Sequence, residues 1–111
     1  MSLLPNFKAN EQGFKPVPNH KGFIAKLIPS PFEASTDVRL AEIAVEGGGP
    51  IEETTHEHDH IFIVLEGQIT VDIAGAKYLV EEEHSIYVEG QIPHSIWNTG
   101  NKTAHVIGVN I

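Results

Sequence analysis

The sequence predicts an all-β protein, built as a sandwich or barrel of short strands. Three observations support this fold class. About nine apolar or alternating segments follow one another at ~8–12-residue spacing, separated by Gly, Pro, Asn and Asp. No stretch repeats apolar residues at i, i+3, i+4 and i+7 over three turns, so no amphipathic helix is expected. The chain has 111 residues, which suits one domain with one core.

The N-terminal segment differs from the rest of the chain. Residues 1–20 contain three prolines and Gly13 among scattered polar residues, so we expect an extended arm there. Residues 21–111 are expected to form the single barrel domain. The arm could lie over the core, lie over a neighbouring subunit, or form a loose tail, and the sequence leaves these alternatives open.

The first half of the barrel is divided by proline and glycine. The first segment ends at Pro29, and the second ends before Gly47. In the second, Val38, Ile43 and Val45 favour a strand over a helix. The strands expected in this half are 22–28, 38–45, 51–56 and 60–65.

The second half shows the clearest alternation. Ile69, Val71 and Ile73 occupy every second position, with polar residues between them, so one face of this strand is expected to be buried. The Ala74-Gly75-Ala76 segment then predicts a turn. The strands expected in this half are 68–73, 77–80, 85–88, 95–99 and 104–111.

The strand at 60–65 is apolar on both faces. His60, Phe62 and Val64 share one face, and the alternate residues are apolar as well. A strand of this kind is expected to be buried on both sides. In so small a protein the second face needs a cover, which could be the N-terminal arm or a second subunit. We expect a homodimer.

Composition excludes several classes of function. The formal net charge is −8 and the seven Lys and Arg residues are dispersed, which argues against binding to nucleic acid or to an anionic membrane. There is no cysteine, so disulfides, thiolate ligands and thiol nucleophiles are excluded. No segment approaches ~18 consecutive apolar residues, and the N-terminus lacks the layout of a signal peptide. We therefore expect a cytoplasmic protein.

The strongest chemical signal is a group of three histidines at alternate positions. His56, His58 and His60 lead directly into the apolar strand. Residues two apart in a strand point to the same side, so all three could converge if the strand is regular. A kink at Asp59 would change which of them do. Imidazole binds zinc, iron, manganese, nickel and copper, so the pattern indicates a metal site.

His94 is expected to complete this site. It shares its parity with Ile96 and Asn98, so the three side chains would point inward together. Three or four protein ligands that leave positions open form a reactive site rather than a closed structural one. The alternative is a set of surface histidines, which would be the better interpretation for a single histidine. Asp59 or Glu57 could orient one of the imidazoles.

The remaining histidines carry weaker signals. His84 lies in a Glu-rich turn and is expected to be exposed. His105 shares its parity with two apolar neighbours and is expected in the core. His20 ends the N-terminal arm and suggests no role. Tyr78 and Tyr87 could line a pocket, as could Phe62, although core packing is the default for aromatic side chains.

The histidine segments resemble the two sequence motifs of the cupin family. The first motif is Gly, five residues, His, one residue, His, three or four residues, Glu, six residues, Gly. Counted from Gly48, its first histidine position holds Thr54 and its second holds His56. Its glutamate position holds His60, and its last position is Gly67.

The second cupin motif is matched at its end. The motif is Gly, five residues, Pro, one residue, Gly, two residues, His, three residues, Asn. His94 and Asn98 fit the last two positions, whereas Glu83, Glu89 and Gln91 replace the glycine, proline and glycine. The two motifs together span about half of the chain. The resemblance implies the cupin double-stranded β-helix, a jelly-roll barrel.

The resemblance implies two alternative sets of metal ligands. Thr54 is a poor ligand for a soft divalent metal, so the strict register leaves His56, His60 and His94. A slipped register adds His58 and restores four ligands. His58 is the residue that distinguishes the two alternatives.

The function implied by the resemblance is that of a small metal-binding cupin. It could be a dioxygenase-type enzyme that uses iron, manganese, nickel or zinc to act on a small organic molecule. The alternative is a non-enzymatic cupin that binds or senses a small molecule, with or without a metal. No residue stands out as a general base, so no catalytic residue is assigned. The sequence also lacks a phosphate-binding loop and a dinucleotide fingerprint.

Overall fold

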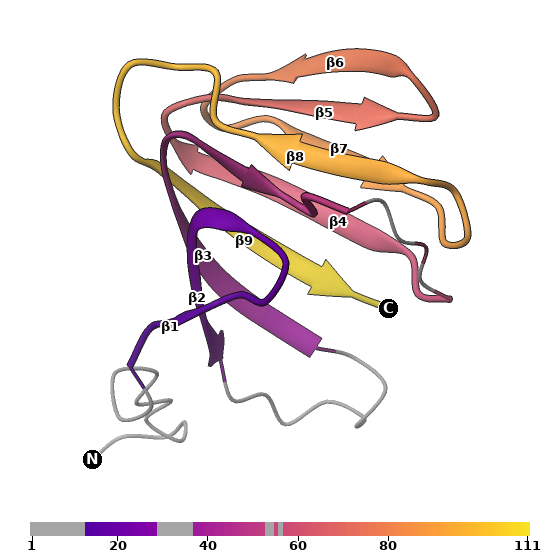
Figure 1. Cartoon of the computed structure of the whole chain (residues 1–111), viewed down its shortest axis with the longest axis horizontal. Helices are drawn as coiled ribbons and strands as arrows, with labels where there is room; N and C mark the ends of the chain where they lie inside the picture. The colour runs from indigo at the N-terminus through magenta and orange to yellow at the C-terminus, as the bar shows by residue number, and fades with distance from the viewer. Residues whose placement is uncertain (1–12, 29–36, 53–54, 56) are drawn as a thin grey trace.

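The computed structural model describes residues 13–28, 37–52, 55 and 57–111 (Figure 1). All regular elements in this part of the chain are strands, which confirms the all-β prediction. None of the described residues belongs to a helix long and apolar enough to span a membrane. The strands are β1 (Lys15–Pro16), β2 (Lys21–Ile28), β3 (Asp37–Gly49), β4 (His60–Glu66), β5 (Ile69–Ile73), β6 (Ala76–Val80), β7 (Ser85–Val88), β8 (His94–Trp97) and β9 (Ala104–Asn110).

The strands form one antiparallel sheet that folds into a nearly closed barrel. Its order is β6-β5-β8-β3-β9-β4-β7, and β2 adds to β3 and carries β1. In Figure 1, β5, β6 and β8 lie at the top, and β1 and β2 lie at the bottom. The barrel therefore has two layers, and β3 is the strand that belongs to both.

The passage of β3 from one layer to the other depends on glycine. Residues 37–43 of β3 pair with β2 and β9, whereas Gly48 and Gly49 pair with β8. A Cβ on Gly48 would lie 2.8 Å from the Cα of Trp97 and even closer to the carbonyl oxygen of Ile96. A larger residue would hold β8 away. For this reason the strand continues through the glycines that the sequence suggested would end it.

The other strands test the remaining sequence predictions. The strands expected from 22 to 45 and from 60 to 111 correspond to β2 through β9. The strand expected at 51–56 is wrong, because Ile51 and Glu52 form a bend and the rest is irregular or outside the described residues. Asn19 accounts for this bend. Its backbone oxygen accepts a hydrogen bond from the Ile51 amide (2.7 Å), and its side chain binds the Glu52 backbone at 2.9 and 3.0 Å.

The described part of the N-terminal segment lies against its own barrel. β1 pairs with β2, and the amide of Val17 donates to the carbonyl of Phe23 at 3.0 Å. Residues 1–12 of the expected arm lie outside the described residues.

The hydrophobic core fills the space between the two layers. Ile69 and Val71 are fully buried, as the alternation of their strand predicted. Burying an aliphatic side chain of this size stabilises the fold by roughly 1.5–3 kcal/mol. The buried cluster contains Ile43, Val64, Ile69, Val71, Val80, Val88, Ile96, Ala104 and Val106.

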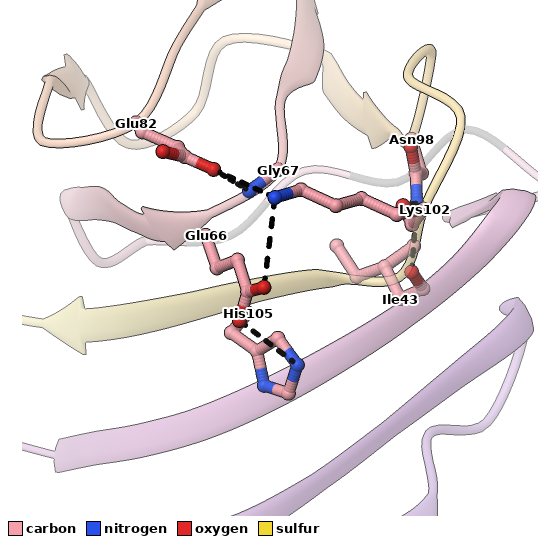
Figure 2. A network of polar contacts seen from close by, with 7 residues as sticks. All are labelled: Ile43, Glu66, Gly67, Glu82, Asn98, Lys102 and His105. Carbon is pink, nitrogen blue, oxygen red and sulfur yellow. Dashed lines mark hydrogen bonds and ion pairs between the residues drawn. The ribbon is translucent and has the colours of Figure 1, made fainter.

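Asn98 links the two layers beside this core (Figure 2). The side chain is only 3% exposed. Its Nδ2 donates to the backbone oxygens of Ile43 and Lys102, both at 2.8 Å, and its Oδ1 accepts from the amide of Gly100 at 2.9 Å. One side chain thus satisfies three backbone groups in β3 and in the turn between β8 and β9.

A surface network surrounds this link (Figure 2). Glu82 accepts a hydrogen bond from the Gly67 amide at 2.9 Å and pairs with Lys102 at 3.1 Å. These contacts, the Gly67 bond first, hold the pKa of Glu82 below its ordinary value. Lys102 also pairs with Glu66, which lies 3.9 Å from His105. Since these side chains are exposed or nearly so, the network adds little to stability.

Replacing Asn98 tests the importance of the link. Asn98→Ala should lower the free energy of unfolding by about 3 kcal/mol, because three backbone groups lose their partner. Urea unfolding followed by circular dichroism measures this change. Asn101→Ala, in the same turn and exposed, is the control and should change stability by less than about 0.5 kcal/mol. A loss below about 1 kcal/mol for Asn98→Ala would show that water replaces the amide.

Candidate metal centre and ligand cavity

A cavity of about 350 Å³ lies between the two layers, next to the core. The inward residues of β9 show how the two regions meet. Ala104 belongs to the core, Val106 borders both regions, and Gly108 and Asn110 line the cavity. The remaining walls come from β2, β3, β4 and β8, from residues just before β2 and β4, and from residues just after β3.

Two of the expected metal ligands meet inside this cavity. His60 begins β4 and His94 begins β8, so they come from opposite layers of the barrel. Their ring centroids are 5.0 Å apart, with the planes tilted by 55°, and each residue is only 8% exposed. Phe62 stacks on His60 at 5.7 Å. The fold therefore brings together two histidines that are 34 residues apart in the sequence.

Hydrogen bonds determine which nitrogen of each ring carries the lone pair. Nδ1 of His60 donates to Oδ1 of Asn110 at 2.6 Å, and Nδ1 of His94 donates to the carbonyl of Ile92 at 3.1 Å. Because both partners are oxygen acceptors, each Nδ1 carries a hydrogen, and in the neutral imidazole the lone pair then lies on Nε2. Histidines that bind metals usually donate their second nitrogen to an oxygen in this way.

The two histidines fit a divalent transition metal. Two imidazoles bound to one ion through bonds of about 2.1 Å have their ring centroids about 5 Å apart. The observed separation of 5.0 Å agrees with this arrangement. Among the described residues, no three His, Asp or Glu side chains lie close enough to hold an ion together. His60 and His94 are thus the two predicted ligands that the described part of the chain brings together.

The other two expected ligands lie in the segment before β4. His58 is exposed at the mouth of the cavity, and it lies in a bend rather than in a strand. It does not form one group with His60 and His94. His56 lies outside the described residues. The regular alternation considered for these histidines is wrong, because residues 57–59 are not part of a strand.

Asp59 produces the kink that ends this alternation. Its carboxylate accepts hydrogen bonds from the Tyr87 hydroxyl and from the Gly90 amide, the latter at 2.7 Å. These bonds, the Tyr87 bond first, hold the pKa of Asp59 below its ordinary value, and the bond to Asp59 raises the pKa of Tyr87. A Cβ on Gly90 would lie 2.9 Å from the His58 oxygen and closer still to the Glu57 oxygen. The backbone of Glu57 and His58 therefore lies in direct contact with Gly90.

The cavity also contains residues to which the sequence assigned no role. Asn110 orients His60, a role that the sequence suggested for Asp59 or Glu57. His20 lines the wall, with its ring 4.8 Å from the ring of Phe23. The histidine gave no sequence signal because the wall forms only when the segment before β2 folds back over the barrel.

Arg39 also lines the cavity. It has the same parity in β3 as Ala41 and Ile43, both of which are buried. That shared parity was the signal in the sequence that could have identified it.

The structure confirms some of the predictions for the remaining histidines and aromatic residues and contradicts others. His84 is exposed, as expected. His105 does not lie in the core, because it pairs across the sheet with Glu42 and lies beside Glu66 on the outer face. Tyr78 and Tyr87 are exposed and do not line the cavity, whereas Phe62 does.

The contact at Gly90 gives a direct test of how the histidine segment is positioned. Gly90→Ala should displace residues 57–59 and lower the free energy of unfolding by about 1–3 kcal/mol, because the new methyl group overlaps backbone. Amide chemical shifts of residues 57–60 report the displacement. Gly108→Ala is the matched control, since a Cβ there would meet nothing closer than 3.7 Å. Equal shifts in both variants would contradict the proposed contact.

Comparison with known proteins relates this geometry to a family. Residues 41–110 match the family model for the cupin domain. No curated protein matches the chain.

Solved structures give many matches to the fold. A RmlC-like cupin from Shewanella frigidimarina is 16% identical with a TM-score of 0.76, and the match covers 96% of this chain and 90% of that one. The polyketide cyclase RemF from Streptomyces resistomycificus is 20% identical with a TM-score of 0.76, covering 99% and 78%. KdgF from Halomonas sp. is 16% identical with a TM-score of 0.74, covering 96% and 94%. At these identities the likeness shows a shared fold.

Proposed function

The chain belongs to the cupin family, and on that basis we propose that it is a small metal-dependent cupin that binds an organic molecule in its cavity. One observation carries this proposal. His60 and His94 lie 5.0 Å apart between their ring centroids, and each donates its Nδ1 hydrogen to an oxygen. Both features are typical of histidines that share a metal ion through Nε2.

In this proposal His60 and His94 are the ligands from the barrel strands. His56 and His58 are the further ligands suggested by the sequence, with His56 common to both alternative registers. The metal would be iron, manganese, nickel or zinc, and when bound it would supply a Lewis acid and a template for the organic molecule. The hydrogen bond that His60 Nδ1 donates to Asn110 Oδ1 would keep the His60 ring oriented while the metal is exchanged.

The reaction we favour is of the dioxygenase type. The walls beside the two histidines include the apolar side chains of Phe62, Ile96 and Val106. Among the described lining residues there is no carboxylate to serve as a general base, which suits a reaction that depends on the metal rather than on acid–base groups. The same feature suits the alternative, a non-enzymatic cupin that binds or senses the molecule. Measured turnover of a bound compound would separate the two.

Metal binding can be tested with protein purified without a nickel column and stripped with EDTA. Titration with zinc, manganese and nickel should give about one ion per chain. His94→Ala should weaken binding by at least about 100-fold, because it removes a ligand from the inner wall. His84→Ala is the matched control, since this histidine is exposed and its Nδ1 bonds to the nearby carbonyl of Glu82. Full binding by His94→Ala would refute the proposed centre.

The same titration distinguishes the alternative ligand sets. His58→Ala should leave the affinity unchanged in the strict register and weaken it strongly in the slipped register. His56→Ala should weaken binding in both registers, so unchanged binding would remove His56 from the site.

We also propose that the protein is a homodimer. The outer face of β3, β9 and β4 supports this, because aligned apolar side chains cover it and remain partly exposed. These residues are Val38, Leu40, Ile61, Ile63, Ile107 and Val109.

Sedimentation of the wild-type chain and of Ile63→Glu tests the dimer. The wild type should be dimeric and the variant monomeric, since a charge would lie in the apolar interface. Leu79→Glu is the control because Leu79 is exposed on β6, away from this face. A monomeric wild type or a dimeric Ile63→Glu variant would contradict the proposal.

A further inference from the structure

The electrostatic character of the cavity is opposite to that of the whole chain. The formal net charge is −8, with 15 acidic residues. None of the described residues that line the cavity is Asp or Glu. The lining instead contains Arg39 and the histidines His20, His58, His60 and His94. An acidic protein that keeps carboxylates out of one cavity and places a permanent cation there is suited to an anionic ligand.

Arg39 retains the capacity to bind an anion. Its Nε and Nη2 both donate to the same oxygen of Asp37, at 3.2 and 3.0 Å. A guanidinium has five N–H donors, so this contact uses only part of the group. The side chains are 52% and 31% exposed, and ion pairs of that exposure are weak. A carboxylate that enters the cavity can therefore engage the remaining donors in the two-point geometry that arginine favours.

The space beside Arg39 is open because Gly108 has no side chain. Gly108 lies between Arg39 and Phe62 in the register of the sheet. Its backbone does not require glycine, since its φ is not positive and a Cβ would lie 3.7 Å from the nearest ring atom of Phe62. Glycine in the middle of a strand lowers stability and often marks a place where a ligand approaches closely. Here the space that it leaves belongs to the cavity.

We propose that the ligand is a small carboxylic acid, bound as its anion, with the carboxylate on Arg39 and an apolar body over Gly108 beside Phe62. This inference rests on the ligand-binding role of the cavity in the proposed function and names the class of ligand. The cavity of about 350 Å³ limits the ligand to a small molecule. A single guanidinium within largely apolar walls suits a monoanion better than a phosphate dianion.

Pairs of probes that differ only in charge test the proposal. Metal-free, isotope-labelled protein is titrated with benzoate or benzamide, and with hexanoate or hexanamide, while amide chemical shifts are followed. At least one acid should shift the amides of Ala41 and Gly108 and bind about tenfold more tightly than its amide. Metal-free protein is used so that binding to an ion cannot imitate binding to Arg39. Equal binding of acid and amide, no binding of either acid, or tighter binding of phenyl phosphate would overturn the proposal.

Variants locate the binding site. Arg39→Gln should weaken binding of the acid by about tenfold or more, because the charged hydrogen bonds are lost. Lys77→Gln is the matched control, since it removes the same charge from a residue paired with Asp72 outside the cavity. Gly108→Val should weaken binding comparably by filling the space for the apolar body, and its dispersed amide spectrum would show that it folds. Wild-type affinity in Arg39→Gln would overturn the assignment.

The outcomes separate this inference from the metal centre. Metal titration of Arg39→Gln should match that of the wild type, because Arg39 is not a proposed ligand. If the wild-type protein binds metal but does not bind a carboxylate, only the proposed ligand class is overturned. Carboxylate binding that depends on Arg39, in a protein that binds no metal, would support the ligand class and refute the metal centre.

Discussion

The close approach of β3 to β8 is the constraint on which the rest of the structure depends. β3 pairs with β2 and β9 through its first half and with β8 through Gly48 and Gly49, so a single strand joins both layers. Because Gly48 has no side chain, the backbone of β8 can lie against it. That contact sets the position of β8 and so places His94 opposite His60, which β4 contributes from the other layer. The candidate metal centre is thus a consequence of how one strand crosses the barrel.

The residues that stabilise the fold and the residues that line the cavity lie next to each other on the inward faces of the same strands. Along β9, Ala104 and Val106 pack into the core. Farther along the strand, Gly108 leaves space in the cavity and Asn110 places a polar side chain there. Asn98 ties the layers together beside the core by satisfying buried backbone groups. This division lets the cavity contain an arginine, several histidines and a strand glycine, none of which would stabilise a closed core.

Local patterns predicted most of the strands because a strand buried on one face must alternate, and that alternation is visible in the sequence. The strand expected at 51–56 does not begin at Ile51 and Glu52, which form a bend because Asn19 takes their backbone hydrogen bonds. His105 was misplaced for a related reason. It shares its parity with apolar residues, but these residues face outward, and parity alone does not say which face is inside.

The sequence by itself determined the fold class and the family resemblance, and it led to the prediction that His60 and His94 share one site with His56 and His58. Residue type and spacing were sufficient because strand alternation and motif spacing are local properties. Only the tertiary structure decided that these two rings meet, that Asn110 orients one of them, and that Arg39 and Gly108 share their cavity. These features depend on the register between strands far apart in the chain, and register is set by packing and by the Asp59 and Gly48 contacts rather than by any single segment.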